Sequence, residues 1–276
     1  MRLIIIFLIG TLSFLNWGST GHRALAEVAS FYLTDNAKKK INEILDGETI
    51  VTASMYADDI KSDSRYDEYY NWHFINMELD EDYEDTVPSE KGDVFIAINK
   101  CLDILESDSV TDSEKSFYLK LLIHFIGDLH QPMHSGRGED RGGNRVYVKW
   151  FGRNSNLHRV WDSEMINGYN MSYSELAKNL PTPEKLEIEF ERDDLIGWVN
   201  EIHSYTRKIY NGVEIDDNLG YEYQYENFQT VRDLILKGGL RLDLSQFESF
   251  HTDIHILNYH QLKHHCISLL YKNGFR

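Results

Sequence analysis

The chain of 276 residues is poor in cysteine, with only Cys101 and Cys266. Two cysteines allow one bridge at most, so the fold is not a disulfide scaffold, and we expect the pair to stay unlinked. Only four prolines are present, and no low-complexity linker or internal repeat marks a domain boundary. A single domain is therefore predicted, with a core drawn from a chain that is 42% hydrophobic.

Positive charge is also scarce. The chain has 28 Lys and Arg residues against 45 Asp and Glu residues, for a formal net charge of −17. Proteins that grip nucleic-acid phosphates with lysine and arginine are normally basic, so this binding mode is not expected over the surface as a whole. Bound metal ions could still create a locally positive site in an acidic protein.

Long apolar runs are absent except at the N-terminus, which reads MRLIIIFLIGTLSFLN. Arg2 precedes an apolar stretch of signal-peptide length that is too short for a comfortable membrane span. We interpret residues 1–16 as a signal peptide. The alternative is an uncleaved anchor, because Phe14 and Asn16 stand where a cleavage site prefers small residues. The mature protein is expected to be exported, to the periplasm or outside the cell, without stable membrane association.

Helical periodicity dominates the rest of the chain. Apolar residues recur at helical spacing in seven segments: 21–33, 93–107, 113–130, 162–169, 173–180, 195–210 and 227–242. Thr111 with Glu114, or Ser113, marks the start of the third segment, and Pro132 marks its end. Only 144–151 alternates like a strand of a short hairpin, and its partner is not evident. The prediction is a mainly α protein, a single compact helical domain with a small β-hairpin.

Histidine and aspartate recur at a spacing of one helical turn. His124 and Asp128 lie in LLIHFIGDLHQPMHSG and share one helix face, and His158 and Asp162 repeat the spacing. Imidazole and carboxylate are ligands that zinc prefers. One such pair is more often a surface pair or a satisfied core hydrogen bond, but two pairs are harder to explain in that way.

Other histidines and acids extend this pattern. Asp58 and His73 lie beside aromatic residues, His22 follows the apolar N-terminal run, and His134 follows the proline break. Together these residues provide five imidazoles and three carboxylates, enough for more than one metal ion. His130 is left over, and we interpret it as structural, with a hydrogen bond near the helix end.

Six motifs of the chain resemble those of a known family. They are WGSTGH (17–22), YADDIK (56–61), WHFIN (72–76), HFIGDLHQPMH (124–134), DRGGN (140–144) and HRVWD (158–162). In this order they are similar to the zinc-dependent single-strand-specific nucleases of fungi and the bifunctional nucleases of plants, with bacterial members. The zinc-dependent phospholipases C of bacteria are more distant relatives.

The resemblance implies how the chain is organised. A nuclease domain over 17–247 would have the helical fold of the zinc-dependent phospholipase C and nuclease type. The tail 248–276 has an uncertain role, and its five histidines are more simply read as incidental on a surface helix than as a metal site.

The resemblance also implies a site for three zinc ions. The implied ligands are Asp58, His73, His124 and Asp128 for the first ion, His134, His158 and Asp162 for the second, and His22, a bridging Asp128 and the α-amino and carbonyl groups of Trp17 for the third. The last set requires cleavage after Asn16, because a free amine is a good ligand and an amide nitrogen is not.

Catalytic and substrate-binding roles follow from the same resemblance. Asp58 would orient the attacking water, and Lys61 would neutralise the phosphate as a point charge. Phe74 would stack on a base, unless it is a core residue, and Asn144 would contact the bound nucleotide. Asn76 stands where the family often has aspartate. Because asparagine both donates and accepts, we expect altered or relaxed base preference.

The leading hypothesis is an exported, monomeric endonuclease. It would hydrolyse single-stranded DNA and RNA to 5′-nucleotides and could also act on 3′-nucleotides, because a base inside a duplex cannot stack on a side chain. A phospholipase C is the alternative enzyme, although WHFIN and DRGGN favour the nuclease. A non-catalytic zinc protein is a third possibility, which the complete ligand set disfavours.

Overall fold

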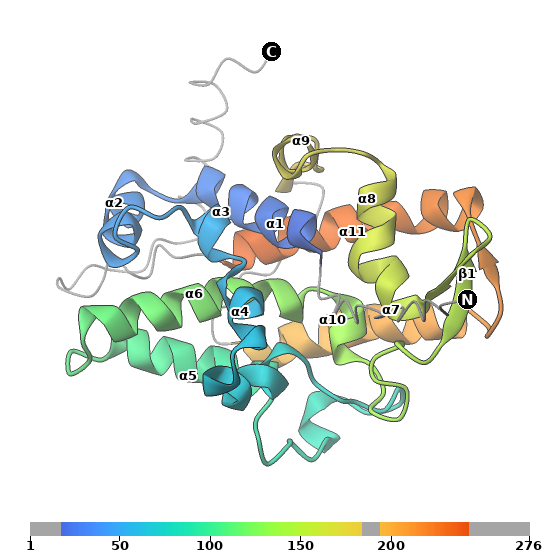
Figure 1. The fold of residues 1–276 in the computed structure, drawn as a ribbon, viewed down its shortest axis with the longest axis horizontal. Coiled ribbons are helices and arrows are strands. Elements are labelled where there is room, and N and C mark those ends of the chain that lie inside the picture. The colour runs from blue at the N-terminus through green and yellow to red at the C-terminus, as the bar shows by residue number, and fades with distance from the viewer. Residues whose placement is uncertain (1–17, 184–193, 243–276) are drawn as a thin grey trace, which may run out of the picture.

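The computed structural model describes residues 18–183 and 194–242 (Figure 1). The predicted signal peptide, Trp17, Cys266 and the tail lie outside these residues. Cys101 is buried in the core, on a helix of the predicted set. In the described part of the chain, no helix is both long and apolar enough to cross a membrane.

Most of the fold consists of helices that the periodicity predicted. These are α1 (Ser19–Tyr32), α5 (Val94–Glu106), α6 (Asp112–Leu129), α9 (Tyr173–Lys178), α10 (Leu195–Asn211) and α11 (Tyr221–Arg241). Thr111 and Glu114 form the capping box that begins α6. Helix α11 begins earlier than predicted. The periodicity missed its first turns because they carry exposed tyrosines and glutamates in place of an apolar stripe.

Periodicity missed the shorter helical elements. They are α2 (Asp35–Ile44), α3 (Ile50–Ala53), α4 (Tyr56–Asp59), η1 (Ile60–Ser62), η2 (Ser64–His73), η3 (Tyr83–Asp85), η4 (Pro132–Ser135) and α7 (Leu157–Arg159). The predicted helix 162–169 is a π-helical turn, η5 (Val160–Glu164), followed by α8 (Met165–Gly168). Elements of three or four residues present too few apolar positions to show a period, and α2 and η2, with ten residues each, bury only two side chains apiece.

Helix α6 lies at the centre of the packing. It contacts α5 along one side and α1 and α11 along another, as Figure 1 shows. Every residue from Leu121 to Leu129 is buried, including two that are polar. The apolar surroundings of this helix half therefore enclose polar side chains.

The predicted strand has two partners. β1 (Tyr147–Trp150) pairs antiparallel with β2 (Arg153–Asn156) and parallel with β3 (Asn218–Leu219), so the order is β2–β1–β3. The hairpin turn uses Phe151 and Gly152, both with positive φ, at 48° and 75°. The mainly helical fold with a small hairpin is thus confirmed.

Candidate metal centre

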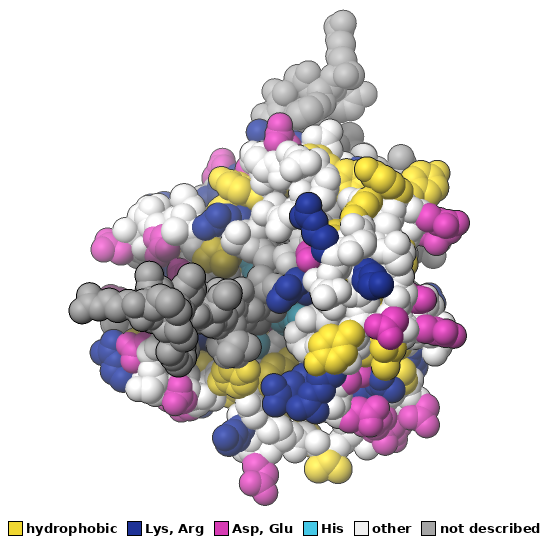
Figure 2. Space-filling view, turned by 45° about the vertical axis from the view of Figure 1, so that its right-hand side comes forward, with side chains coloured by type: hydrophobic (Ala, Val, Ile, Leu, Met, Phe, Trp, Pro, Cys, Tyr) yellow, Lys and Arg dark blue, Asp and Glu magenta, His cyan; other side chains and the backbone are white. Residues whose placement is uncertain are grey.

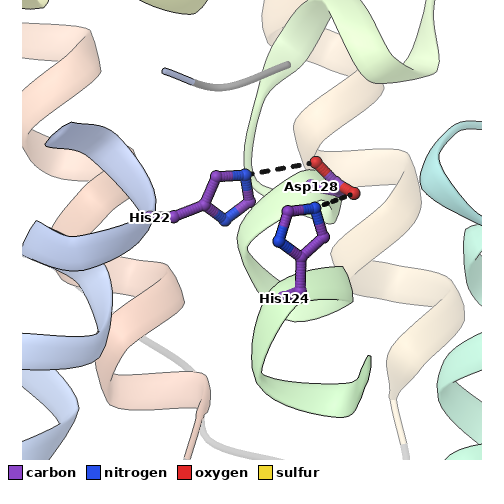
Figure 3. A group of neighbouring side chains, drawn as sticks. All are labelled: His22, His124 and Asp128. Atoms are coloured by element: carbon purple, nitrogen blue, oxygen red, sulfur yellow. Dashed lines mark ion pairs between the residues drawn. The ribbon is translucent and has the colours of Figure 1, made fainter. Parts of the chain in front are cut away.

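His22 from α1 and the pair His124 and Asp128 from α6 converge in the interior (Figure 3). Nε2 of His22 lies 3.4 Å from Asp128 Oδ1, and Nε2 of His124 lies 3.1 Å from Asp128 Oδ2. A Cβ on Gly127 would lie 2.4 Å from His22 Nδ1, so glycine is required there for the helices to approach. The one-turn spacing of His124 and Asp128 thus lets both side chains face His22, about a hundred positions away in the sequence.

Asp58 from α4 and His73 from the end of η2 complete a second group around His124. Asp58 Oδ1 lies 3.4 Å from His124 Nε2 and 4.0 Å from His73 Nδ1. His73 Nδ1 also lies 2.7 Å from Asp128 Oδ2. All four ligands implied for the first zinc therefore meet at one place.

The second implied set also meets. His134 from η4, His158 from α7 and Asp162 from η5 offer ligand atoms that lie within 4.8 Å of one another. The rings of His134 and His158 stack with centroids 5.3 Å apart. His134 Nδ1 lies 3.0 Å from Asp128 Oδ1, so Asp128 adjoins both groups.

Backbone carbonyls orient two of these imidazoles. His124 Nδ1 lies 2.6 Å from the carbonyl of Ser54, and His158 Nδ1 lies 2.8 Å from the carbonyl of Gly142. A carbonyl only accepts, so each Nδ1 carries the hydrogen and each Nε2 lone pair faces the other ligands. Gly142 has φ 61°, and a Cβ there would lie 2.3 Å from Met133 O, which explains a glycine in the DRGGN motif.

Several buried ligand atoms lack hydrogen bonds of good geometry within the described ranges, although charged groups lie near some of them. They are His124 Nε2, Asp128 Oδ1, His134 Nδ1 and Asp162 Oδ2. Leaving a buried polar atom unsatisfied costs about 1–3 kcal/mol. Nitrogen and oxygen donors that converge without protein partners fit the coordination shell of a metal ion.

Comparison with known proteins identifies the family. The model of the S1/P1 nuclease family matches residues 17–244. This chain belongs to the S1/P1 nuclease family. It is therefore a hydrolase that acts on phosphodiester bonds, in a family that depends on metal.

Named relatives of this nuclease come from plants and fungi. Endonuclease 5 of Arabidopsis thaliana is 27% identical, with 82% of this chain and 88% of the relative covered. Nuclease S1 of Aspergillus oryzae is 26% identical, with 82% and 89% covered. Nuclease P1 of Penicillium citrinum is 29% identical, with 66% and 72% covered.

Burial and neighbouring charges shift the pKa values of the ionisable groups in the nuclease site, upward for some groups and downward for others. Burial raises the pKa of Asp162 well above its usual value, against a hydrogen bond from Gln131 that lowers it. Burial, with the nearby His124, lowers the pKa of His22 to about 4. Burial would lower the pKa of His124 too, but Asp128 and Asp58 raise it to about 10. Without metal, protons must balance the buried carboxylates, and a bound cation would replace them.

The residues implied for substrate line a less buried part of the nuclease. Lys61 Nζ lies 2.9 Å from Asp58 Oδ1, so a cation stands beside the ligand cluster. Phe74 is half-buried, with its ring 6.2 Å from that of Tyr70, and it does not belong to the apolar core. Asn76 and Asn144 are exposed, and Asn144 Nδ2 donates to the carbonyl of Arg141.

Gln131 is a contributor that the sequence did not reveal. Its fully buried side chain donates from Nε2 to Asp162 Oδ1 at 3.3 Å and accepts at Oε1 from the Met133 N–H. It therefore holds a ligand carboxylate in place from the end of α6. A polar residue between His130 and Pro132 was the available signal, but a partner distant in sequence could not be read from it.

His130 faces away from the ligands of the nuclease. Its Nδ1 donates to the carbonyl of Ile126 at 2.8 Å, and Arg241 donates to its Nε2 at 3.1 Å. Burial, with Arg241, lowers the pKa of His130 to about 3. The predicted structural role near the helix end is confirmed.

Proposed function

We propose that this protein is a zinc-dependent endonuclease that hydrolyses single-stranded DNA and RNA to 5′-nucleotides. The observation that carries the proposal is the convergence of three groups of imidazoles and carboxylates, drawn from seven helical elements, in an S1/P1 nuclease. Imidazole with carboxylate suits zinc. The same site would accept 3′-nucleotides, and the enzyme would act as a monomer.

We propose that the groups hold three zinc ions. Asp128 would bridge two of them, because it lies within ion-pair distance of histidines from both halves of the cluster. The set around His134 would hold the remaining ion by itself. Three ions would make this pocket positive inside a chain of net charge −17, so a phosphodiester could bind without a basic surface overall.

The third ion would need the free α-amino group of Trp17. Gly18, the next residue, donates its N–H to the carbonyl of Asp162 at 2.8 Å, which places the start of α1 beside a ligand. The family match also begins at residue 17. We therefore infer cleavage after Asn16 on export, with the mature enzyme periplasmic or extracellular.

When bound, the zinc ions would supply a water of lowered pKa and polarise the phosphate. Asp58 would accept a hydrogen bond from that water and orient it toward phosphorus. Lys61, beside Asp58, would stabilise negative charge that develops on the phosphate oxygens. The apolar half of α6 excludes bulk water and strengthens both interactions.

Recognition would depend on a base that is free to stack. The exposed part of Phe74 can meet the face of a base, an interaction worth about 1–3 kcal/mol that tolerates any sequence. Asn76 and Asn144 would hydrogen-bond the nucleotide, for which the Asn144 amide must leave the Arg141 carbonyl. Asn76 offers both a donor and an acceptor, so relaxed base preference is expected.

The test uses the mature protein beginning at Trp17. It is incubated with single-stranded DNA, a 3′-nucleotide and phosphatidylcholine, with and without chelator. We expect chelator-sensitive cleavage of the nucleic acid to products that carry a 5′-phosphate. Cleavage of the lipid alone, or activity that chelator leaves intact, would contradict the proposal.

A second test addresses the N-terminus. A form that retains Asn16 should lose one zinc ion of three and most of its activity, because the nitrogen of residue 17 is then an amide. Metal analysis by mass spectrometry measures the stoichiometry. Three ions in both forms would rule out the α-amine as a ligand.

A further inference from the structure

Basic residues are concentrated in one segment of this acidic chain. Residues 137–159 contain six of its 28 lysines and arginines, and no aspartate or glutamate occurs between Asp140 and Asp162. The segment includes the DRGGN loop and the β1–β2 hairpin. Its charge is opposite in sign to that of the whole protein, so this segment is a part of the surface that would attract an anionic partner.

Four of these cations are exposed: Arg141, Arg145, Lys149 and Arg153. Within the described ranges none of the four pairs with a carboxylate, whereas Arg137 pairs with Glu139 and Asp140. In the neighbouring acidic turn 214–217, one carboxylate is used within the turn: that of Asp217 accepts a hydrogen bond from the Glu214 N–H. Figure 2 shows Lys and Arg side chains gathered beside the histidines on this face, with acidic side chains mostly toward its edges.

The outer face of the small sheet also lacks acidic residues. Tyr147 and Lys149 point outward, alternating with the buried Val148 and Trp150. Cross-strand partners share a face, so Asn156 and Asn154 of β2 and Asn218 of β3 lie beside them. The face combines an aromatic ring, a cation and amide groups that can donate and accept.

Exposed aromatic rings continue the surface at the hairpin tip. Phe151 is 39% exposed, and Tyr221 and Tyr225, one helical turn apart at the start of α11, are 82% and 83% exposed. The Phe151 ring lies 4.7 Å from that of Tyr221, edge to face. A φ of 48° is uncommon for a bulky side chain, and asparagine or glycine would be ordinary there. The turn therefore presents a ring outward at a conformational cost.

The hairpin is directly connected to the metal centre. β2 runs into α7, where His158 follows Leu157, and the Leu157 N–H donates to Val146 O at the base of the hairpin. Four residues of strand extend roughly 13 Å from there to the turn. That length is several times the roughly 3.4 Å per nucleotide of a strand within a duplex, so more than one nucleotide could lie along it.

We propose that this ridge, formed by the outer face of β1–β2, Phe151, Tyr221 and Tyr225, binds single-stranded nucleic acid beyond the nucleotide held at the metal centre. The proposal rests on the proposed nuclease function and names its substrate as a polynucleotide. Unpaired cations match the phosphates, and the rings offer stacking surfaces for successive bases. The outer face beside the rings carries asparagine amides and no aliphatic side chain, whereas a surface that enters a membrane interface combines its aromatic rings with leucine or similar apolar side chains.

The experiment compares two substrates of the zinc-loaded enzyme: thymidine dinucleotide, too short to reach the ridge, and an oligothymidylate of about twelve nucleotides, within the usual site size of a single-strand binder. The variant combines Phe151→Asn, which suits the positive φ, with Tyr221→Ala and Tyr225→Ala. We expect kcat/KM for the long substrate to fall about tenfold, the lower end of what base stacking contributes. The value for the dinucleotide should not change.

A second variant removes charge, Lys149→Ala with Arg153→Ala. The slope of log KM for the long substrate against log salt should become shallower by about 1.4, since each phosphate contact with a single strand contributes about 0.7. The matched control, Lys38→Ala with Lys39→Ala, removes two exposed cations from α2, at the opposite end of the molecule from the hairpin in Figure 1. It should leave the slope unchanged.

The outcomes separate the ridge from the nuclease function. Wild-type protein that cleaves neither substrate would contradict the nuclease function itself. Wild type active on both, with variants that lose nothing or lose equally on both, would overturn the ridge alone. Binding to vesicles of anionic phospholipid that the variants lose, with cleavage of the long substrate intact, would show a membrane surface and overturn the ridge as well.

Discussion

Two histidines four residues apart, His130 and His134, are both buried but belong to opposite kinds of polar cluster. Both ring nitrogens of His130 have hydrogen-bond partners, and the neighbouring Arg241 is paired with Glu201. His134 instead faces the carboxylates of Asp128 and Asp162, with Nδ1 left without a hydrogen bond of good geometry in the described residues.

The two clusters also differ in charge. Around His130 the cations Arg241 and Lys237 accompany one carboxylate, Glu201, so neutral imidazole suffices. The metal cluster to which His134 belongs contains three carboxylates, those of Asp58, Asp128 and Asp162, with Lys61 beside only Asp58. Burial alone therefore does not distinguish a structural histidine from a metal ligand. The two kinds of histidine are distinguished by how many of their ring nitrogens have hydrogen-bond partners and by the sign of the net charge of the surrounding cluster.

The largest effect is expected from Asp128→Asn. Asp128 lies within ion-pair distance of four histidines, so losing its charge should affect both halves of the cluster. Nuclease activity should fall by more than about 100-fold, beyond the range seen for outer-shell partners of a metal site, and bound zinc should decrease. The control is Asp93→Asn, a buried N-cap of α5 outside the cluster. Normal zinc content in D128N would contradict the proposed bridge.

An intermediate effect is expected from Gln131→Leu, which keeps the size of the side chain but removes its hydrogen bonds to Asp162 and to the Met133 N–H. Zinc affinity should fall by about 10–100-fold, as for other partners that orient metal ligands. Competition with a chromogenic chelator measures it. Gln224→Leu is the matched control, a buried glutamine that donates to Met165 O. Equal affinity in both variants would show that Asp162 needs no such support.

His130→Leu should affect stability without affecting metal. It leaves the Ile126 carbonyl and an Arg241 N–H without their partner, at a cost of about 1–3 kcal/mol in the free energy of unfolding. Denaturant unfolding measures this cost, and zinc content should match that of the wild type. Loss of zinc in H130L would break the distinction between the two clusters. Arg241→Leu and the double variant would then test whether the two side chains are coupled.

The smallest effect, when measured at mildly acidic pH, is a pH dependence. The pKa of His130 is lowered from its ordinary 6.5 to about 3, so the unfolded chain binds a proton that the folded one excludes. Neutral His130 therefore contributes its full stability above pH 6.5, and this is lost as pH falls toward 3, by at most about 1.4 kcal/mol per pH unit. In metal-depleted protein, the stability gap between wild type and H130L should be constant above pH 6.5 and narrow below it. A constant gap would mean that His130 titrates normally.

Much of the fold followed from local pattern. The apolar periodicity of α1, α5 and α6 predicted long helices because each buries a face, and Pro132 marked the end of α6. The start of α11 was missed because its tyrosines face solvent. The partner strands of β1 were missed because β2, RNSN, and β3, NL, lack the alternation of a half-buried strand.

Sequence by itself determined which residue types could hold metal, because one-turn spacing places His124 and Asp128 on one face whatever the rest of the chain does. Only the tertiary structure decided which side chains share a group, that Gln131 holds Asp162, and that His130 turns toward Arg241. The physical reason is that these outcomes depend on contacts between residues tens to more than a hundred positions apart. Helix packing sets such contacts, and spacing along the chain does not encode them.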